Sequence, residues 1–275
     1  MKKVYIPQLT PHGGTLTGYL HDPDDIYIFR GIRPGILVIP GGGYQKLAGR
    51  EKDPVAFEYF AEGFNTFVLE YSIQEYAPGL EPLGLKPLKE ASAAIIAIRE
   101  NAADWNTNPN QIAALGFSAG GHLAASCATL WDCEELKKEF DTRGGMNRPD
   151  AAILCYAVTL TGEFGHEGSA RNLAGDGDPS FYNLVNHIGS HTPPVFLWTT
   201  VTDELVPPEN TLMFAQGLQA NHIPYELHMY PHGRHGLTLG KMETNEDHPH
   251  LATWVGLSKM WLSELFGFSI SRSYP

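Results

Sequence analysis

The pentapeptide Gly116-Phe117-Ser118-Ala119-Gly120 has the G-x-S-x-G pattern, in which a serine can serve as a nucleophile. It lies between an apolar run, 112–117, that predicts a strand and a small-residue stretch, 119–130, that predicts a helix. At such a junction the serine sits on a sharp turn, and glycines on either side avoid steric clashes. We therefore predict an activated Ser118, although a glycine-rich turn with an incidental serine would show the same pattern.

A second segment, Pro40-Gly41-Gly42-Gly43-Tyr44, directly follows a run of apolar residues at 35–39. Glycines leave backbone N–H groups unobstructed, so beside a nucleophile they can bind a developing oxyanion. The dinucleotide-binding pattern fails because its last glycine is replaced by Lys46, and no phosphate-loop lysine follows. We predict an oxyanion hole made by Gly42, Gly43 and Ala119.

An acid and a histidine follow later strands. Asp203 comes after the apolar run 195–199, and His235 follows the alternating segment 225–230. The chain order of serine, aspartate and histidine is the one that α/β-hydrolases use. Glu204 and His232 are the neighbouring competitors, and we favour Asp203 and His235 as the partners of the serine.

The elements around these residues alternate between strands and helices. We predict strands at 35–39, 66–71, 112–117, 151–156, 195–199 and 225–230, helices at 54–62, 87–105, 119–130, 207–220 and 250–266, and a turn at 106–110. This alternation predicts an α/β fold with a mostly parallel central sheet and helices on both faces. We expect a single domain over 1–275, with insertions near 132–150 and 157–194 that shape specificity.

Composition narrows the function classes. The net charge is −12, which argues against nucleic acid or an anionic membrane as a partner. We find no secretory leader and no apolar run of transmembrane length, and the three cysteines suggest reduced thiols, so we expect a cytoplasmic protein. No metal motif such as HExxH or CxxC is present, and His228, His232 and His235 do not share one face, so we expect neither metal nor cofactor.

Together, PGGGY, GFSAGGHLA, TDELVPPEN and HGRHG resemble the α/β-hydrolase superfamily, in its esterase/lipase branch of acetyl xylan esterase-like and hormone-sensitive-lipase-like bacterial enzymes. Arg50-Glu51 and Pro54 resemble the members that act on sugar esters, whereas Pro40 replaces the family's usual histidine. The resemblance implies Ser118 as nucleophile, His235 as general base and then acid, and Asp203 as the group that orients His235.

These observations predict a serine carboxylic-ester hydrolase that acts through an acyl-enzyme on short-chain esters, with acetylated carbohydrates as candidates. We expect the partner to be a small-molecule ester. The sequence leaves the oligomeric state open, including a homo-oligomer. Two alternatives use the same residues. One is an amide-cleaving peptidase or formamidase, and the other is a non-catalytic binding protein on a hydrolase fold.

Overall fold

The computed structural model describes residues 1–22 and 31–269. In this part of the chain eight strands form one sheet in the order β1-β2-β4-β3-β5-β6-β7-β8. Their bounds are β1 Lys2–Ile6, β2 Thr15–Leu20, β3 Arg33–Ile39, β4 Asn65–Glu70, β5 Thr107–Phe117, β6 Ala151–Cys155, β7 Val195–Thr200 and β8 Tyr225–Tyr230. The strands from β3 to β8 run parallel, and β1 and β2 add an antiparallel edge.

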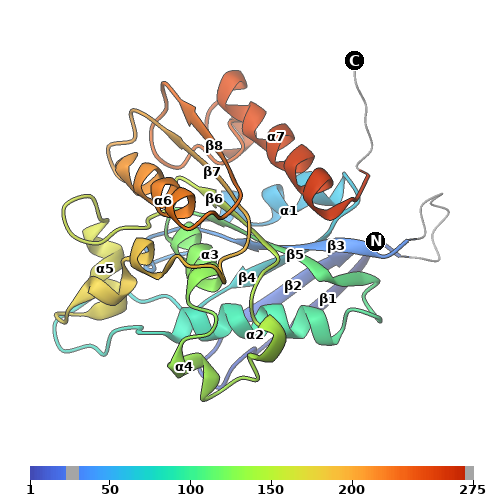
Figure 1. Ribbon diagram of the computed structural model, residues 1–275, viewed down its shortest axis with the longest axis horizontal. Coiled ribbons are helices and arrows are strands. Elements are labelled where there is room, and N and C mark those ends of the chain that lie inside the picture. The colour runs from blue at the N-terminus through green and yellow to red at the C-terminus, as the bar shows by residue number, and fades with distance from the viewer. Residues whose placement is uncertain (23–30, 270–275) are drawn as a thin grey trace.

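Helices cover both faces of this sheet (Figure 1). They are α1 Asp53–Phe60, α2 Lys86–Glu100, α3 Ala119–Thr129, α4 Glu134–Lys137, α5 Glu167–Ala174, α6 Glu209–Ala220 and α7 Pro249–Phe266. Alternate residues of each central strand point to opposite faces. Leu37 and Ile39 pack in the core with α2, α3 and α6, whereas Ile36 and Val38 pack with α1 and α7. The predicted α/β fold with a mostly parallel sheet is confirmed.

Three details differ from the prediction. The N-terminal strands β1 and β2 were not predicted, because only one side of the hairpin faces the core and β1 is largely exposed. The helix predicted to reach Trp105 ends at Glu100, and Trp105 instead stacks on Phe67 with ring centroids 5.5 Å apart.

The turn predicted at 106–110 was also wrong. Strand β5 starts at Thr107, which pairs with Arg33, and the next pair joins Gly35 to Ile112. Between these pairs the chain of β5 advances by five residues and that of β3 by two, so a bulge accommodates Pro109 inside the strand.

The segment 132–150 carries α4, and 157–194 carries α5 with two short 3₁₀ turns. The second segment returns to the carboxyl edge of the sheet, where β3, β5, β7 and β8 end. Within the described residues, none of the helices is both long and apolar enough to span a bilayer.

Candidate active site

Ser118 occupies a strained turn between β5 and α3. Its φ of 53° and ψ of −119° lie outside the regions that residues with side chains favour. A Cβ on Gly116 would lie 2.1 Å from the Gly120 oxygen, and one on Gly120 would lie 2.3 Å from the Ile39 oxygen. The two glycines are therefore required by backbone contacts, and the turn directs Ser118 toward the cleft.

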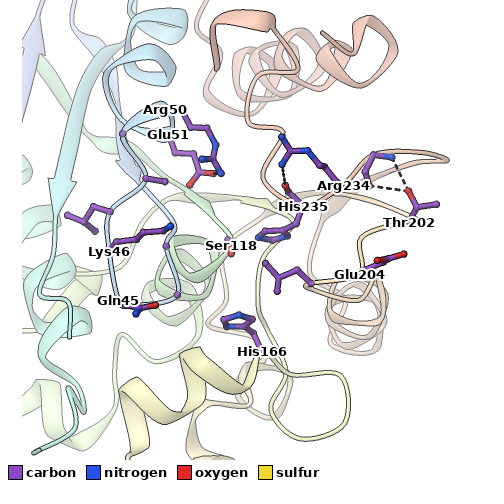
Figure 2. Close-up of a pocket in the computed structure, with 17 residues that line it drawn as sticks. Gln45, Lys46, Arg50, Glu51, Ser118, His166, Thr202, Glu204, Arg234 and His235 are labelled. Atoms are coloured by element: carbon purple, nitrogen blue, oxygen red, sulfur yellow. Dashed lines mark hydrogen bonds and ion pairs between the residues drawn. The ribbon is translucent and has the colours of Figure 1, made fainter. Parts of the chain in front are cut away.

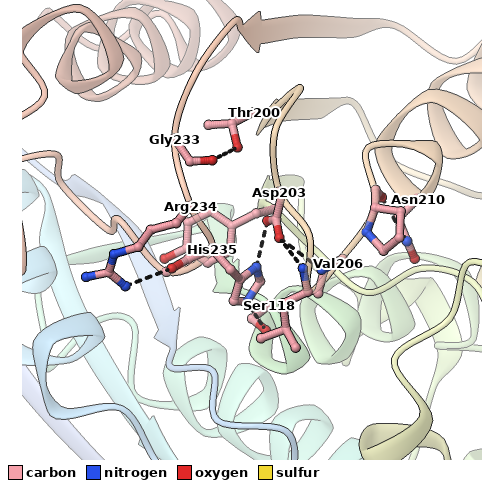
Figure 3. Close-up of polar contacts among 12 residues, drawn as sticks. Ser118, Thr200, Asp203, Val206, Asn210, Gly233, Arg234 and His235 are labelled. Carbon is pink, nitrogen blue, oxygen red and sulfur yellow. Dashed lines mark hydrogen bonds and ion pairs between the residues drawn. The ribbon is translucent and has the colours of Figure 1, made fainter.

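A continuous hydrogen-bond chain joins Ser118, His235 and Asp203 (Figure 3). The Ser118 hydroxyl lies 2.8 Å from His235 Nε2, and His235 Nδ1 lies 2.7 Å from Asp203 Oδ2. The aspartate side chain is 1% exposed and the histidine side chain 13%. With a proton on Nδ1 donated to the carboxylate, Nε2 is free to accept from the serine.

Hydrogen bonds hold Asp203 and the loop that carries His235. Asp203 Oδ1 accepts hydrogen bonds from the backbone N–H groups of Leu205 and Val206, at 3.0 and 2.9 Å. The Gly233 carbonyl, two residues before His235, accepts from the Thr200 hydroxyl at 2.7 Å. The competing residues Glu204 and His232 are exposed, and neither takes part in this chain of hydrogen bonds.

The glycine loop, residues 40–44, lies directly against Ser118. A Cβ on Gly41 would lie 3.0 Å from Ser118 Cβ. Gly42 and Gly43 have φ values of 131° and 67°, and both line the same cleft as Ser118. The Gly41 N–H donates to Glu51 Oε2 at 2.8 Å, so it is not free for a substrate. An oxyanion hole formed by Gly42, Gly43 and Ala119 stays a prediction.

Contacts from distant segments fix this loop, and no local sequence pattern points to them. Asn172 on α5 donates through Nδ2 to the Gly43 carbonyl at 2.9 Å. The Tyr44 hydroxyl lies 2.7 Å from His122 Nδ1, and His122 Nε2 lies 3.1 Å from the Tyr182 carbonyl. Since a carbonyl only accepts, Nε2 carries the proton and Tyr44 donates to Nδ1.

His122 is thus a structural residue and not a second base. It is buried on α3, and desolvation lowers its pKa to about 4. The thiols of Cys127 and Cys155 are also buried, and burial raises their pKa values, which makes them poor nucleophiles. His228 pairs with Glu226 at 2.7 Å, and among the described residues no group of three or more His, Cys, Asp or Glu side chains could hold a metal.

The cleft above Ser118 has a volume of about 1020 Å³ (Figure 2). Its walls are part polar and part apolar: Leu47, Ala48 and Leu205 line it together with the polar side chains of Gln45, Lys46, Arg50, His166, Thr202, Glu204 and Arg234. His166 precedes α5, and its Nδ1 accepts from the Ser169 backbone N–H at 3.1 Å. Burial, with a smaller contribution from His235, lowers the pKa of His166, so this part of segment 157–194 presents a neutral imidazole to the cleft.

The sequence matches the BD-FAE family over residues 25–162. The chain belongs to the BD-FAE family. It is 37% identical to the acetyl ester-xyloside bifunctional hydrolase of Caldicellulosiruptor lactoaceticus, whose structure superposes with a TM-score of 0.79 over 94% of this chain and 90% of that one.

Two curated relatives are similar to this BD-FAE chain. Endo-1,4-beta-xylanase B of Butyrivibrio fibrisolvens is 36% identical over 83% of this chain and 35% of its own length. An acetylxylan esterase of Xylanibacter ruminicola is 30% identical over 74% of this chain and 41% of its own length. The chain therefore spans well under half the length of the curated relatives it matches.

Proposed function

We propose that this chain is a serine carboxylic-ester hydrolase that removes short acyl groups from carbohydrates. The observation that carries the proposal is the hydrogen-bond chain from Asp203 through His235 to Ser118 at the floor of the cleft. The family match and the esterase names of its relatives support the same reaction class.

The geometry suits a double displacement. As the Ser118 oxygen attacks the ester carbonyl, its proton passes to His235 Nε2, and the buried Asp203 carboxylate stabilises the resulting imidazolium. His235 then gives this proton to the departing alcohol, which leaves an acyl group on Ser118. Water, deprotonated by the same nitrogen, attacks the acyl-enzyme and releases the acid.

The tetrahedral intermediates carry a negative oxygen that needs preorganised donors. We assign the backbone N–H groups of Gly42, Gly43 and Ala119 to this role, because the glycines line the cleft beside Ser118 and Ala119 begins α3. Each such donor contributes on the order of 3 kcal/mol to lowering the barrier.

The walls of the cleft favour a polar alcohol group. The side chains of Gln45, Lys46, Arg50 and Arg234 offer many hydrogen-bond donors to hydroxyl groups. Carbohydrate is also the partner that the names of an acetylxylan esterase and of an acetyl ester-xyloside hydrolase specify for those relatives. We therefore propose acetylated xylo-oligosaccharides as the substrate class.

The test measures hydrolysis of p-nitrophenyl esters from acetate to octanoate, of acetylated xylo-oligosaccharides and of a matched p-nitroanilide. We expect activity to be highest on acetyl esters and to fall beyond propionate, with the anilide much slower. Ser118→Ala should lower kcat by at least about 10⁴-fold. The matched control, Ser263→Ala on α7, should keep full activity. Full activity of Ser118→Ala would refute the mechanism, and a faster anilide would indicate an amidase.

A further inference from the structure

Two adjacent residues, Arg50 and Glu51, connect the two loops of the site. Glu51 Oε2 accepts the Gly41 N–H at 2.8 Å, and Arg50 Nε donates to the Gly236 carbonyl at 3.1 Å. Gly41 belongs to the glycine loop, and Gly236 directly follows His235. We propose that Arg50 and Glu51 are positioning residues that hold the oxyanion donors and the catalytic histidine in register, a proposal that rests on the function proposed above.

Glu51 also reaches the histidine loop by a second route. Its Oε1 accepts from the Tyr156 hydroxyl at 2.9 Å, and that hydroxyl accepts from the Thr238 N–H at 3.2 Å. The Tyr156 ring lies edge-on to the His235 ring, with centroids 4.9 Å apart and an interplanar angle of 70°. One carboxylate therefore touches the glycine loop directly and the histidine loop through Tyr156.

The burial of Glu51 shows that its contacts are tightly constrained. The residue is 1% exposed, and each carboxylate oxygen accepts a hydrogen bond. Burial raises the pKa of Glu51 above its ordinary value, and the Gly41 N–H, Arg50, the Tyr156 hydroxyl and His235 offset only part of that rise. A buried carboxylate is costly unless it is fully paired, so the protein gains little stability from it, and a positioning role explains its presence better.

The hydrogen bond to Gly41 has a direct consequence for the donors of the hole. Gly41 is pressed against the turn at residues 116–120 (the nucleophile turn), since a Cβ there would lie 2.6 Å from the Phe117 oxygen. Once its N–H is fixed on Glu51, the following peptides must turn, and Gly42 and Gly43 adopt the positive φ values that place them along the cleft. Without Glu51 the loop could rotate its N–H groups away from the oxyanion.

The charge of Glu51 should affect the pH dependence of catalysis, which a purely structural role would not change. The groups that face its carboxylate are the Arg50 guanidinium at 3.7 Å, Tyr71, Cys155, Tyr156 and His235. An ionised Glu51 and a positively charged His235 attract each other. Removing the charge of Glu51 while keeping the shape should therefore move the acid limb of the kcat/KM profile to lower pH.

Three variants test the proposal. Glu51→Gln keeps one hydrogen-bond acceptor and removes the charge, whereas Glu51→Ala removes both hydrogen bonds that Glu51 accepts. Arg50→Met removes the hydrogen bond to the Gly236 carbonyl. The matched control is Glu90→Gln. Glu90 is a fully buried carboxylate that accepts from the Ser72 N–H at 2.6 Å and its hydroxyl at 2.5 Å, and its pKa is likewise raised by burial. All variants are assayed with p-nitrophenyl acetate across pH, with a fluorophosphonate that labels Ser118, and by thermal unfolding.

We expect Glu51→Gln to lower kcat about tenfold with KM nearly unchanged and with its acid limb at lower pH, and Glu51→Ala and Arg50→Met to lower kcat further. Glu90→Gln should keep the wild-type kcat and profile. If Glu51→Ala does not fold, Glu51→Gln decides. The positioning role would be overturned if Glu51→Gln kept the wild-type kcat and pH profile, or if Glu90→Gln lowered kcat by as much as Glu51→Gln does. A wild-type protein that neither hydrolyses esters nor is labelled would instead overturn the proposed function.

Discussion

The nucleophile turn and the glycine loop lie side by side at the carboxyl edge of the sheet, yet they are held in different ways. Around Ser118 the backbone leaves no room for a Cβ at Gly116 or Gly120. The glycine loop is equally crowded at Gly41 and Gly42, and it depends in addition on side chains from other segments, namely Glu51, Asn172 and His122. Steric exclusion therefore acts in both regions, and the loop adds polar side-chain contacts from other segments.

This difference implies two kinds of failure. A side chain added to the turn must displace backbone atoms, so it should damage folding and activity together. Removing a polar anchor of the loop leaves the packed core intact, so it should reduce turnover while the protein stays folded. Activity and stability measured on the same variants separate these two cases.

Among the variants that test this comparison, Gly120→Ala should have the largest effect. Its Cβ would lie 2.3 Å from the Ile39 oxygen and 2.4 Å from the Pro40 oxygen, so the start of α3 must move away from the sheet. We expect kcat to fall by about 10³-fold and the free energy of unfolding to fall by about 3 kcal/mol. Ester hydrolysis and urea unfolding measure both.

Gly256→Ala on α7 is the control, since nothing lies within 4 Å of a Cβ there. It should raise stability by up to about 1 kcal/mol and leave kcat unchanged. Equal behaviour of the two alanine variants would show that steric exclusion does not fix the nucleophile turn.

The same difference explains what the sequence could predict. The turn is encoded within five residues, and so the end of the strand at Phe117, Ser118 and the following helix were predicted at nearly the observed positions, whereas the strand starts five residues before its predicted start. Asp203 and His235 followed from their order after β7 and β8, and the structure brings both to Ser118. Strands β3, β6 and β7 were predicted because burial on both faces makes them continuously apolar, whereas the half-buried β8 was predicted from its alternating pattern.

The loop anchors could not be predicted in this way. Asn172 lies 129 positions from Gly43, and His122 lies 78 positions from Tyr44, so no local pattern links them. Glu51 was identified from the sequence only as part of the Arg50-Glu51 and Pro54 pattern. Its role depends on a contact with Tyr156, 105 positions away. The edge strands β1 and β2 were not predicted for a related reason, because their pairing, rather than apolar periodicity, defines them.

His122 connects the two regions, since it lies on α3 and accepts from Tyr44 of the glycine loop. Its pKa is lowered to about 4 from 6.5, so the unfolded chain binds a proton more readily between these values. Stability should therefore fall as pH drops from 6.5 toward 4, by up to about 3 kcal/mol from this group. His122→Gln should reduce that fall.

The measurement is urea unfolding at pH 7 and pH 4.5. Part of the slope will persist in the variant, because burial also lowers the pKa of His21 to about 4. A His21→Gln variant measures that part separately. If His122→Gln loses as much stability on acidification as the wild type, His122 is not held in its neutral form in the folded protein.

The smallest effect is expected from Asn172→Ala, which removes the amide that donates to the Gly43 carbonyl. The peptide that follows this carbonyl then gains freedom, and we expect kcat to fall about tenfold with KM within about twofold of the wild type. Asn221→Ala, which removes an exposed amide–carbonyl hydrogen bond at the end of α6, is the control and should leave kcat unchanged.

Because Asn172 belongs to segment 157–194, a selective loss of kcat would show that this segment supports the glycine loop as well as lining the cleft. If KM rises instead and kcat holds, the segment acts on substrate binding alone, and polar contacts from α5 do not set the geometry of the loop.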